Sequence, residues 1–132
     1  MTNSIHLQNV TIKLFEKNGT AACFIESLRN CETRICLLPN ECLILAGNLE
    51  IIEFIIEQHK HLEEGDYLYV KKVKLESFDE LRFRLESDGV CQLFIYKSLL
   101  DTCNIFHGFS ITHSEIPCVK DFLIKHFKPN IC

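Results

Sequence analysis

Apolar and polar residues follow similar patterns in two stretches of the chain that lie about seventy residues apart. Residues 11–25 read TIKLFEKNGTAACFI, and residues 81–95 read LRFRLESDGVCQLFI. In each stretch, apolar residues that alternate with polar ones predict a half-buried strand. Asn-Gly or Asp-Gly follows, and these pairs favour the type I′ turn of a two-residue hairpin, because both of its central residues have positive φ. The pattern therefore predicts one β-hairpin in each half of the chain.

The two stretches also match residue by residue at an offset of 70: Phe15 with Leu85, Glu16 with Glu86, Asn18 with Asp88, Gly19 with Gly89, Phe24 with Phe94 and Ile25 with Ile95. Another strand-like run follows each stretch, at residues 34–38 and 106–112. Each half then ends in a helix-like run with a related sequence, EFII at 53–56 and DFLI at 121–124. A repeated sequence unit predicts a repeated structural unit.

These elements predict an α+β fold of two tandem strand-strand-strand-strand-helix units, residues 1–66 and 67–132, in one compact pseudo-symmetric domain. Strand-forming stretches are expected at 5–15, 21–28, 34–38, 67–75, 81–85, 90–96 and 106–112, and helices at 41–61 and up to 127. Gly47-Asn48 is a candidate kink in the first helix, and Thr112 or Ser114 a candidate cap of the second. Neither helix is expected to be stable alone, so each must pack its apolar stripe on its own sheet or on the other copy. We therefore expect an intramolecular pseudo-dimer with curved antiparallel sheets, monomeric in solution, although a homodimer stays open.

Composition indicates a globular protein, with 47% hydrophobic and 24% charged residues. No apolar run reaches the length of a membrane span, and the N-terminus has no secretory pattern, so we expect an intracellular protein without a membrane partner. The eight cysteines are then expected to be free thiols that pack as small hydrophobic residues. Cys31, Cys36 and Cys42 lack the second close pair that a zinc site prefers. The sequence contains no phosphate-binding Gly loop, Gly-x-Ser-x-Gly or His-Glu-x-x-His, so neither an enzyme nor a cofactor is predicted.

Charge is unevenly distributed along the chain, whose net value is −4. Residues 41–66 carry seven acids and one base, and the rest of the chain carries 13 bases and 11 acids. Most of these bases fall in predicted strands or their loops, so one face of a sheet can be basic although the whole protein is acidic. Charges on strands are also the ordinary solvated side of a half-buried sheet.

The strand-to-helix junctions resemble those of a known family. Residues 108–116, GFSITHSEI, look like the Gly-Ile-Ser-Leu-x-Pro-Glu-Gln-Trp junction of the positive cofactor four family, and residues 35–41, ICLLPNE, resemble the same junction and keep its Pro. Members of this family are single-stranded-DNA-binding transcription coactivators related in fold to the Whirly proteins. Cys42 and Ile116 stand where the family has Trp, and Arg34 or its neighbourhood and His107 stand where it has a basic residue. The resemblance covers both halves and implies a diverged tandem duplication.

In that family two units dimerise through their helices, and their sheets form a channel for single strands. The resemblance therefore implies binding of single-stranded DNA or RNA with little sequence preference, in support of transcription or replication and in the nucleus. A small, cysteine-rich and diverged chain suits a viral genome. Such a site needs cations for phosphates and rings for bases; the candidates are Lys13, Phe15, Lys17, Arg29, Arg34, Arg82, Arg84, Tyr96 and Lys97.

Other interpretations of these residues stay open. Phe15 also suits hairpin or core packing, and Lys71, Lys72 and Lys74 also suit the protection of an edge strand against aggregation. The alternative function is a protein-interaction module of the same fold. On that hypothesis the acidic helix face would bind a basic partner through Glu50, Glu53, Glu57, Glu63 and Glu64.

Overall fold

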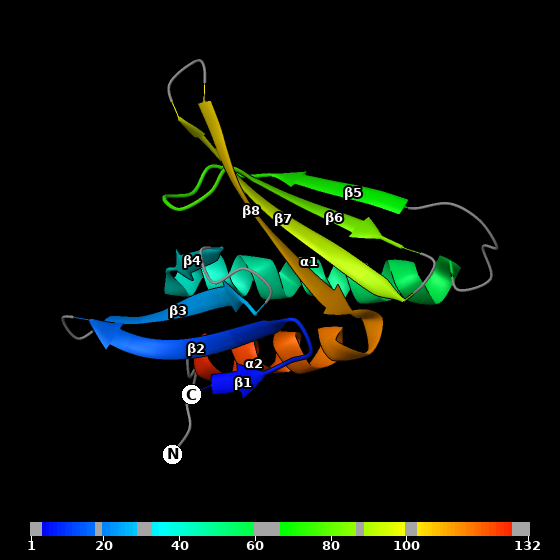
Figure 1. Ribbon diagram of the computed structural model, residues 1–132, viewed down its shortest axis with the longest axis horizontal. Coiled ribbons are helices and arrows are strands. Elements are labelled where there is room, and N and C mark those ends of the chain that lie inside the picture. The colour runs from blue at the N-terminus through cyan, green and yellow to red at the C-terminus, as the bar shows by residue number, and fades with distance from the viewer. Residues whose placement is uncertain are drawn as a thin grey trace, which may run out of the picture.

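The chain folds into two antiparallel four-stranded sheets, each followed by a helix, as the sequence predicts (Figure 1). The computed structural model describes residues 4–17, 20–28, 33–59, 67–86, 89–99 and 103–127. The first unit comprises β1 (Ser4–His6), β2 (Val10–Lys17), β3 (Thr20–Ser27), β4 (Arg34–Leu37) and α1 (Pro39–His59). The second comprises β5 (Tyr67–Lys72), β6 (Glu80–Leu85), β7 (Val90–Leu99), β8 (Cys103–Thr112), a 3-10 turn (His113–Glu115) and α2 (Ile116–Phe127). In both sheets the strands pair in sequence order.

Two boundaries differ from the expected ones. The stretch 5–15 holds β1 and most of β2, because the chain turns between them and the Leu7 amide donates to the Val10 carbonyl at 2.8 Å. The candidate kink at Gly47-Asn48 does not interrupt the helix: α1 continues through both residues, and the Asn48 side chain donates to the Ile44 carbonyl one turn earlier. A side-chain amide that donates to a backbone carbonyl of its own helix has a hydrogen-bond partner there, so a polar residue such as Asn48 can be accommodated in the helix interior.

Both predicted hairpins are present, but their turns differ in length. Lys17 faces Thr20 across the first hairpin, whose two loop residues, 18 and 19, lie outside the described residues. In the second, the Glu86 amide donates to the Val90 carbonyl at 2.9 Å, so three residues form the loop, and Gly89 has a φ of +89°. The two-residue type I′ turn predicted there is therefore wrong, although the glycine does occupy a left-handed conformation.

The extra loop residue changes which face of the sheet each matched residue occupies. Leu85 is buried, whereas Phe15, which matches it in sequence, is only partly buried and stacks on Phe24 of β3. Side chains alternate between the two faces of a strand, so a shift of one residue moves a position to the other face. The offset of 70 identifies the repeat but places only the β3 and β7 residues on equivalent faces.

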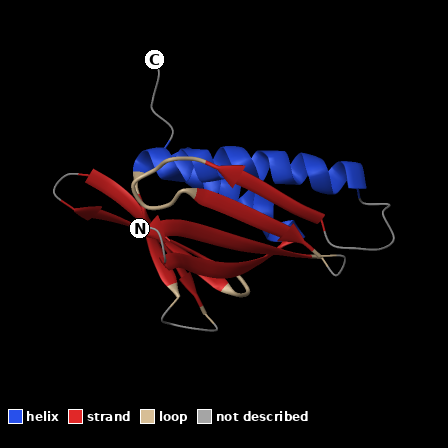
Figure 2. Cartoon of the chain, turned by 90° about the horizontal axis from the view of Figure 1, so that it is seen from above, coloured by secondary structure: helices blue, strands red, loops and turns tan. Residues whose placement is uncertain are grey.

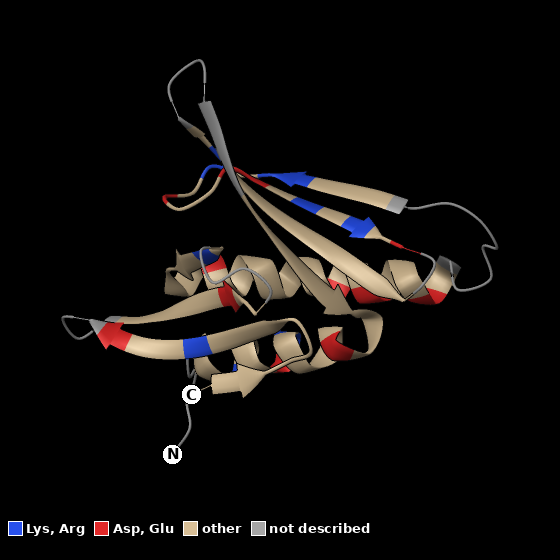
Figure 3. Cartoon of the chain, in the orientation of Figure 1, with Lys and Arg blue, Asp and Glu red and all other residues tan. Residues whose placement is uncertain are grey.

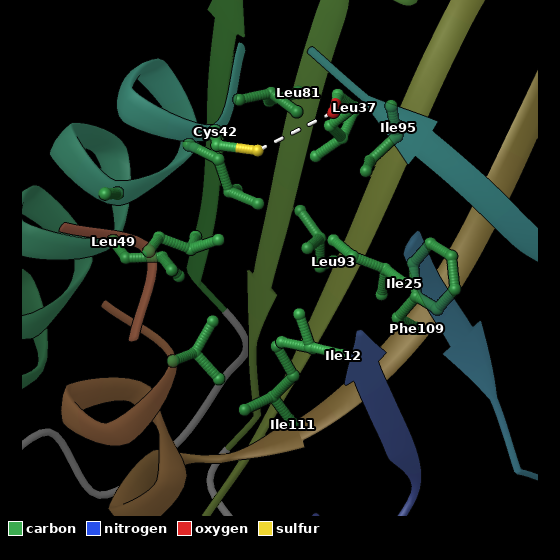
Figure 4. Packing of buried hydrophobic residues seen from close by; sticks show 14 of the residues in the cluster. Ile12, Ile25, Leu37, Cys42, Leu49, Leu81, Leu93, Ile95, Phe109 and Ile111 are labelled. Atoms are coloured by element: carbon green, nitrogen blue, oxygen red, sulfur yellow. Dashed lines mark hydrogen bonds between the residues drawn. The ribbon is translucent and has the colours of Figure 1, made fainter. Parts of the chain in front are cut away.

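The inner faces of both sheets and one side of each helix form a single buried cluster (Figure 4). It includes Ile12, Ile25 and Leu49 of the first unit with Leu93 and Phe109 of the second, each at most 2% exposed. Helix α1 packs against α2, and β8 lies beside β2 and β3. Figure 2 shows the helices together on one side of the strands. Each such side chain contributes about 1.5–3 kcal/mol when fully buried, and because the cluster contains residues of both units, each unit contributes to the stability of the other.

Glu41 lies in the first turn of α1 and forms hydrogen bonds to the second unit. Its carboxylate accepts the Leu38 amide at 2.8 Å, just before α1. The same carboxylate accepts the Ser77 amide at 2.7 Å and the Ser77 hydroxyl at 2.6 Å, in the turn between β5 and β6. A carboxylate in the first turn of a helix satisfies amides that have no partner within the helix.

Glu115 makes the reciprocal contact from the second unit. It accepts the Thr112 amide at 2.9 Å and the Gln8 amide at 2.8 Å, in the turn between β1 and β2. Burial opposes ionisation of Glu115, but the amides of Gln8 and Thr112 outweigh it and hold the pKa below its ordinary value of 4.5. Glu41 and Glu115 thus each accept hydrogen bonds from the other repeat. Thr112 caps the 3-10 turn that precedes α2, and not α2 itself, for which the sequence predicted it.

We predict that Glu41→Gln and Glu115→Gln each lower the free energy of unfolding by about 1.5–3 kcal/mol, because a neutral amide replaces a carboxylate that accepts several hydrogen bonds. Urea denaturation at pH 7 measures the loss, with Glu16→Gln, at an exposed glutamate, as the matched control.

The stabilisation that Glu115 provides should depend on pH. The pKa of Glu115 is lowered in the folded protein, so this stabilisation is fully present above pH 4.5 and is lost as the pH falls through the folded-state pKa. The difference between wild type and Glu115→Gln should therefore shrink as the pH falls below 4.5; a difference that does not depend on pH would contradict the role of the ionised carboxylate.

Candidate nucleic-acid interface

The outer face of the second sheet carries two arginines on β6. Leu81, Phe83 and Leu85 point into the core, so the alternation directs Arg82 and Arg84 outward, where their side chains are 42% and 53% exposed. The Arg82 guanidinium lies 4.7 Å from the centre of the Tyr96 ring, and its Nε lies 2.9 Å from Oε2 of Glu80. The ring and the carboxylate hold the planar guanidinium of Arg82 at the surface.

A pocket of about 550 Å³ opens beside this stacked pair. Its lining combines three cations, two acids, a ring and a hydroxyl: Lys72, Lys74, Arg82, Asp79, Glu80, Tyr96 and Ser98, together with Val73. This volume lies in the range of small-ligand pockets. Lys72 and Lys74, which the sequence leaves open between edge protection and ligand contact, thus share a pocket with Arg82 and Tyr96.

Phe94 occupies the centre of the same face. It faces Arg82 across the β6–β7 pairing and Gly108 across the β7–β8 pairing, and its ring centre lies 6.5 Å from that of Tyr96. A Cβ at position 108 would come within 3.2 Å of Cε1 of Phe94. Gly108 is the first residue of the junction that resembles the family pattern, so its physical role here is to make room for an aromatic ring.

The outer face of the first sheet repeats this combination of rings and cations. Phe15 and Phe24 stack with ring centres 4.4 Å apart and an interplanar angle of 19°. Lys13 is exposed and faces Phe24 across the β2–β3 pairing, and the Arg34 guanidinium lies 5.9 Å from the Phe24 ring centre. Each sheet therefore places a cation directly opposite an aromatic residue: Lys13 opposite Phe24, and Arg82 opposite Phe94.

Phe24 and Phe94 are site residues that the sequence reasoning missed. In the sequence both are matching positions of the repeat, at an offset of 70, and Phe94 also suits packing in the core. Their alternation with the buried Cys23 and Ile25, and with Leu93 and Ile95, places them on the outer faces. That alternation was a signal in the sequence, and it would have separated the rings of the core from those of the surface.

Lys97 has a different environment from the other predicted cations. Its Nζ donates to the Leu75 carbonyl at 2.8 Å and lies 3.2 Å from Oδ1 of Asp79. Asp79 also accepts the Ser98 amide at 2.8 Å, and this bond, with Lys97, keeps the pKa of Asp79 below its ordinary value. Lys97 thus joins the end of β7 to the loop between β5 and β6. The side chain of Lys17, and all of Arg29, lie outside the described residues.

Charge differs between helix α1 and the second sheet (Figure 3). Lysines and arginines lie along β5 and β6, and acids lie along α1, among them the exposed Glu50 and Glu57. Glu53 is paired with Lys120 of α2 at 2.9 Å. Glu63 and Glu64 lie outside the described residues.

Five cysteines are free thiols, Cys23, Cys36, Cys42, Cys91 and Cys118, and Cys23, Cys42 and Cys91 of these are buried. Burial raises the pKa of Cys91 to about 12, and hydrogen bonding to Cys23 together with burial raises the pKa of Cys42. Such thiols stay protonated and pack as small hydrophobic groups, as expected. Within the described ranges, no group of three or more His, Cys, Asp or Glu side chains is arranged to hold a metal ion, and neither helix is long and apolar enough to cross a membrane.

Comparison with known proteins adds no relative: the chain matches no protein-family model, and no curated protein is significantly similar to it. The geometry of the two outer faces is therefore the evidence on which a function must rest.

We predict that Lys97→Met lowers the free energy of unfolding by about 1 kcal/mol, because it removes a hydrogen bond and an ion pair that hold the β5–β6 loop. Urea denaturation measures this loss, and Lys13→Met, at an exposed lysine of β2, is the control that should leave stability unchanged. Full stability of Lys97→Met, combined with weaker oligonucleotide binding, would instead place Lys97 in the interface.

Proposed function

We propose that the protein binds single-stranded nucleic acid with little sequence preference, along the outer faces of its two sheets, in support of transcription or replication in the nucleus. The observation that carries the proposal is the arrangement shared by both sheets: a cation faces a phenylalanine across a strand pair, and a second ring lies beside that phenylalanine.

Single strands present both charged phosphates and unstacked bases, and this surface offers a partner for each. Aromatic stacking contributes about 1–3 kcal/mol per base and tolerates any base, because every base has a π-face. Phe24 and Tyr96 are partly exposed and lie beside Arg34 and Arg82. In a duplex the base faces are stacked on one another, so this arrangement favours single strands.

The separation of charge supports the same proposal. The net charge of −4 would repel a nucleic acid if it were evenly spread, but acids are concentrated on α1, whereas the candidate cations Lys13, Arg34, Arg82 and Arg84 lie on strands. Local potential, more than net charge, determines where a polyanion binds. The likeness of the two strand-to-helix junctions to those of the positive cofactor four family is a further support, and it points to DNA as the first ligand to test.

Replacing Arg82 and Arg84 together by Met should weaken binding and reduce its salt dependence. Each phosphate contact on a single strand contributes about −0.7 to the slope of log affinity against log salt concentration, so loss of two contacts should change the slope by about 1.4. Fluorescence anisotropy with a labelled oligo-dT at several salt concentrations measures both quantities. Lys125→Met, at an exposed lysine of α2, is the control and should change neither.

Replacing the rings should have a different signature in the same assay. Phe24→Leu on the first sheet and Tyr96→Leu on the second should each weaken binding by the equivalent of about 1–3 kcal/mol and leave the salt slope unchanged, because stacking releases no counterions. If the wild-type protein does not bind oligo-dT even at low salt, the proposed function is wrong.

A further inference from the structure

Helix α1 carries a row of residues that faces away from the core. Leu45, Leu49 and Ile52 point inward and are fully buried. On the opposite side, Ile51 is 43% exposed and Phe54 is 65% exposed, the highest value among the large hydrophobic residues that the structure describes. One turn before Ile51 stands Gly47, also exposed, so Gly47, Ile51 and Phe54 follow one another at the spacing of a single helix face.

Gly47 is unfavourable in the middle of a helix, and no contact within the protein explains why glycine is present at this position. Glycine is among the poorest helix formers, because it loses the most backbone entropy on folding. A Cβ at this position would meet nothing within 4 Å, so no packing contact within the protein requires its absence. A missing side chain beside two exposed apolar ones is instead suited to the close approach of another backbone.

Acidic residues border the row on one flank. Glu50 and Glu57 are exposed and seven residues apart, so they lie on the same side of the helix, next to Phe54. Glu53 lies further round, where it pairs with Lys120 of α2. On the other flank Ile55 is partly buried against the core cluster. The row is therefore apolar along its centre and negative along one edge.

We propose that Gly47, Ile51 and Phe54 form a docking surface for an amphipathic helix of another protein, one that carries Lys or Arg beside its apolar side. The glycine admits the incoming helix, the two apolar side chains anchor it, and Glu50 and Glu57 select its charge. A nucleic acid is repelled by this flank. A second copy of the chain is disfavoured, because a symmetric contact between two α1 helices brings four carboxylates together.

The test uses a synthetic helical peptide of Leu and Lys, about 18 residues long and thus about five turns, and a second peptide with Glu in place of Lys. Fluorescence anisotropy should show binding of the Leu/Lys peptide and none of the Leu/Glu peptide. Phe54→Ser should weaken binding by about tenfold or more, as loss of a central anchor does. Leu68→Ser, at an exposed apolar residue of β5, is the matched control and should bind as wild type does.

The Gly47→Ala variant tests whether Gly47 serves peptide binding or is only an unfavourable residue in the helix. Alanine should raise the urea midpoint, because it favours the helix, and should weaken binding of the Leu/Lys peptide, because its methyl group obstructs the approach. A more stable variant with unchanged peptide affinity overturns the proposal, and so does equal binding of both peptides or of neither. Light scattering that reports a dimer, dissociated by Phe54→Ser, would assign the row to a second copy of the 15.3 kDa chain and also overturn it.

Discussion

The two repeats are held together by an exchange of hydrogen bonds between helix starts and strand turns. Glu41 caps α1 and holds Ser77 of the second unit, and Glu115 stands before α2 and holds Gln8 of the first. Each carboxylate satisfies amides of its own junction and of the other repeat at once. Backbone amides at helix starts and in turns need hydrogen-bond partners. These contacts therefore fix the β5–β6 loop against the start of α1, and the β1–β2 turn against the start of α2.

The packing of the two repeats against each other determines which surfaces remain accessible to a ligand or a partner. The inner faces of both sheets are used in a single core with α1 and α2, so any ligand of the sheets must bind on their outer faces. Those faces carry the cations and rings at alternate positions, with Lys13 opposite Phe24 and Arg82 opposite Phe94. The outward side of α1 is left with a different character, apolar and acidic, which is why we assign it a different partner.

Local features of the sequence predicted the local structure well. Asn-Gly and Asp-Gly marked both hairpins, and the alternation in residues 81–85 placed Arg82 and Arg84 outward. The contacts between repeats could not be predicted, because Glu41 meets a residue 36 positions away and Glu115 one 107 positions away, and no pattern in a single sequence connects them. The sequence also did not predict the length of the second hairpin loop, which has one residue more than the first. Because of this extra residue, Leu85 is buried whereas its matching residue, Phe15, lies on the outer face. The role of Lys97 could not be predicted for the same reason: its partners, Leu75 and Asp79, lie distant in the sequence and contact Lys97 only in the folded structure.

An NMR titration that follows the aromatic side-chain resonances with oligo-dT tests the central claim most directly, because one spectrum contains both the proposed contacts and their controls. Phe15, Phe24, Phe94 and Tyr96 lie on the two outer faces, whereas Phe78, Phe83 and Phe109 are buried in the shared core, and Phe54 is exposed on α1. We expect the resonances of the first group to shift on both sheets, while those of the buried rings and of Phe54 stay in place. Shifts confined to Phe54, or no shifts at all, would contradict the account.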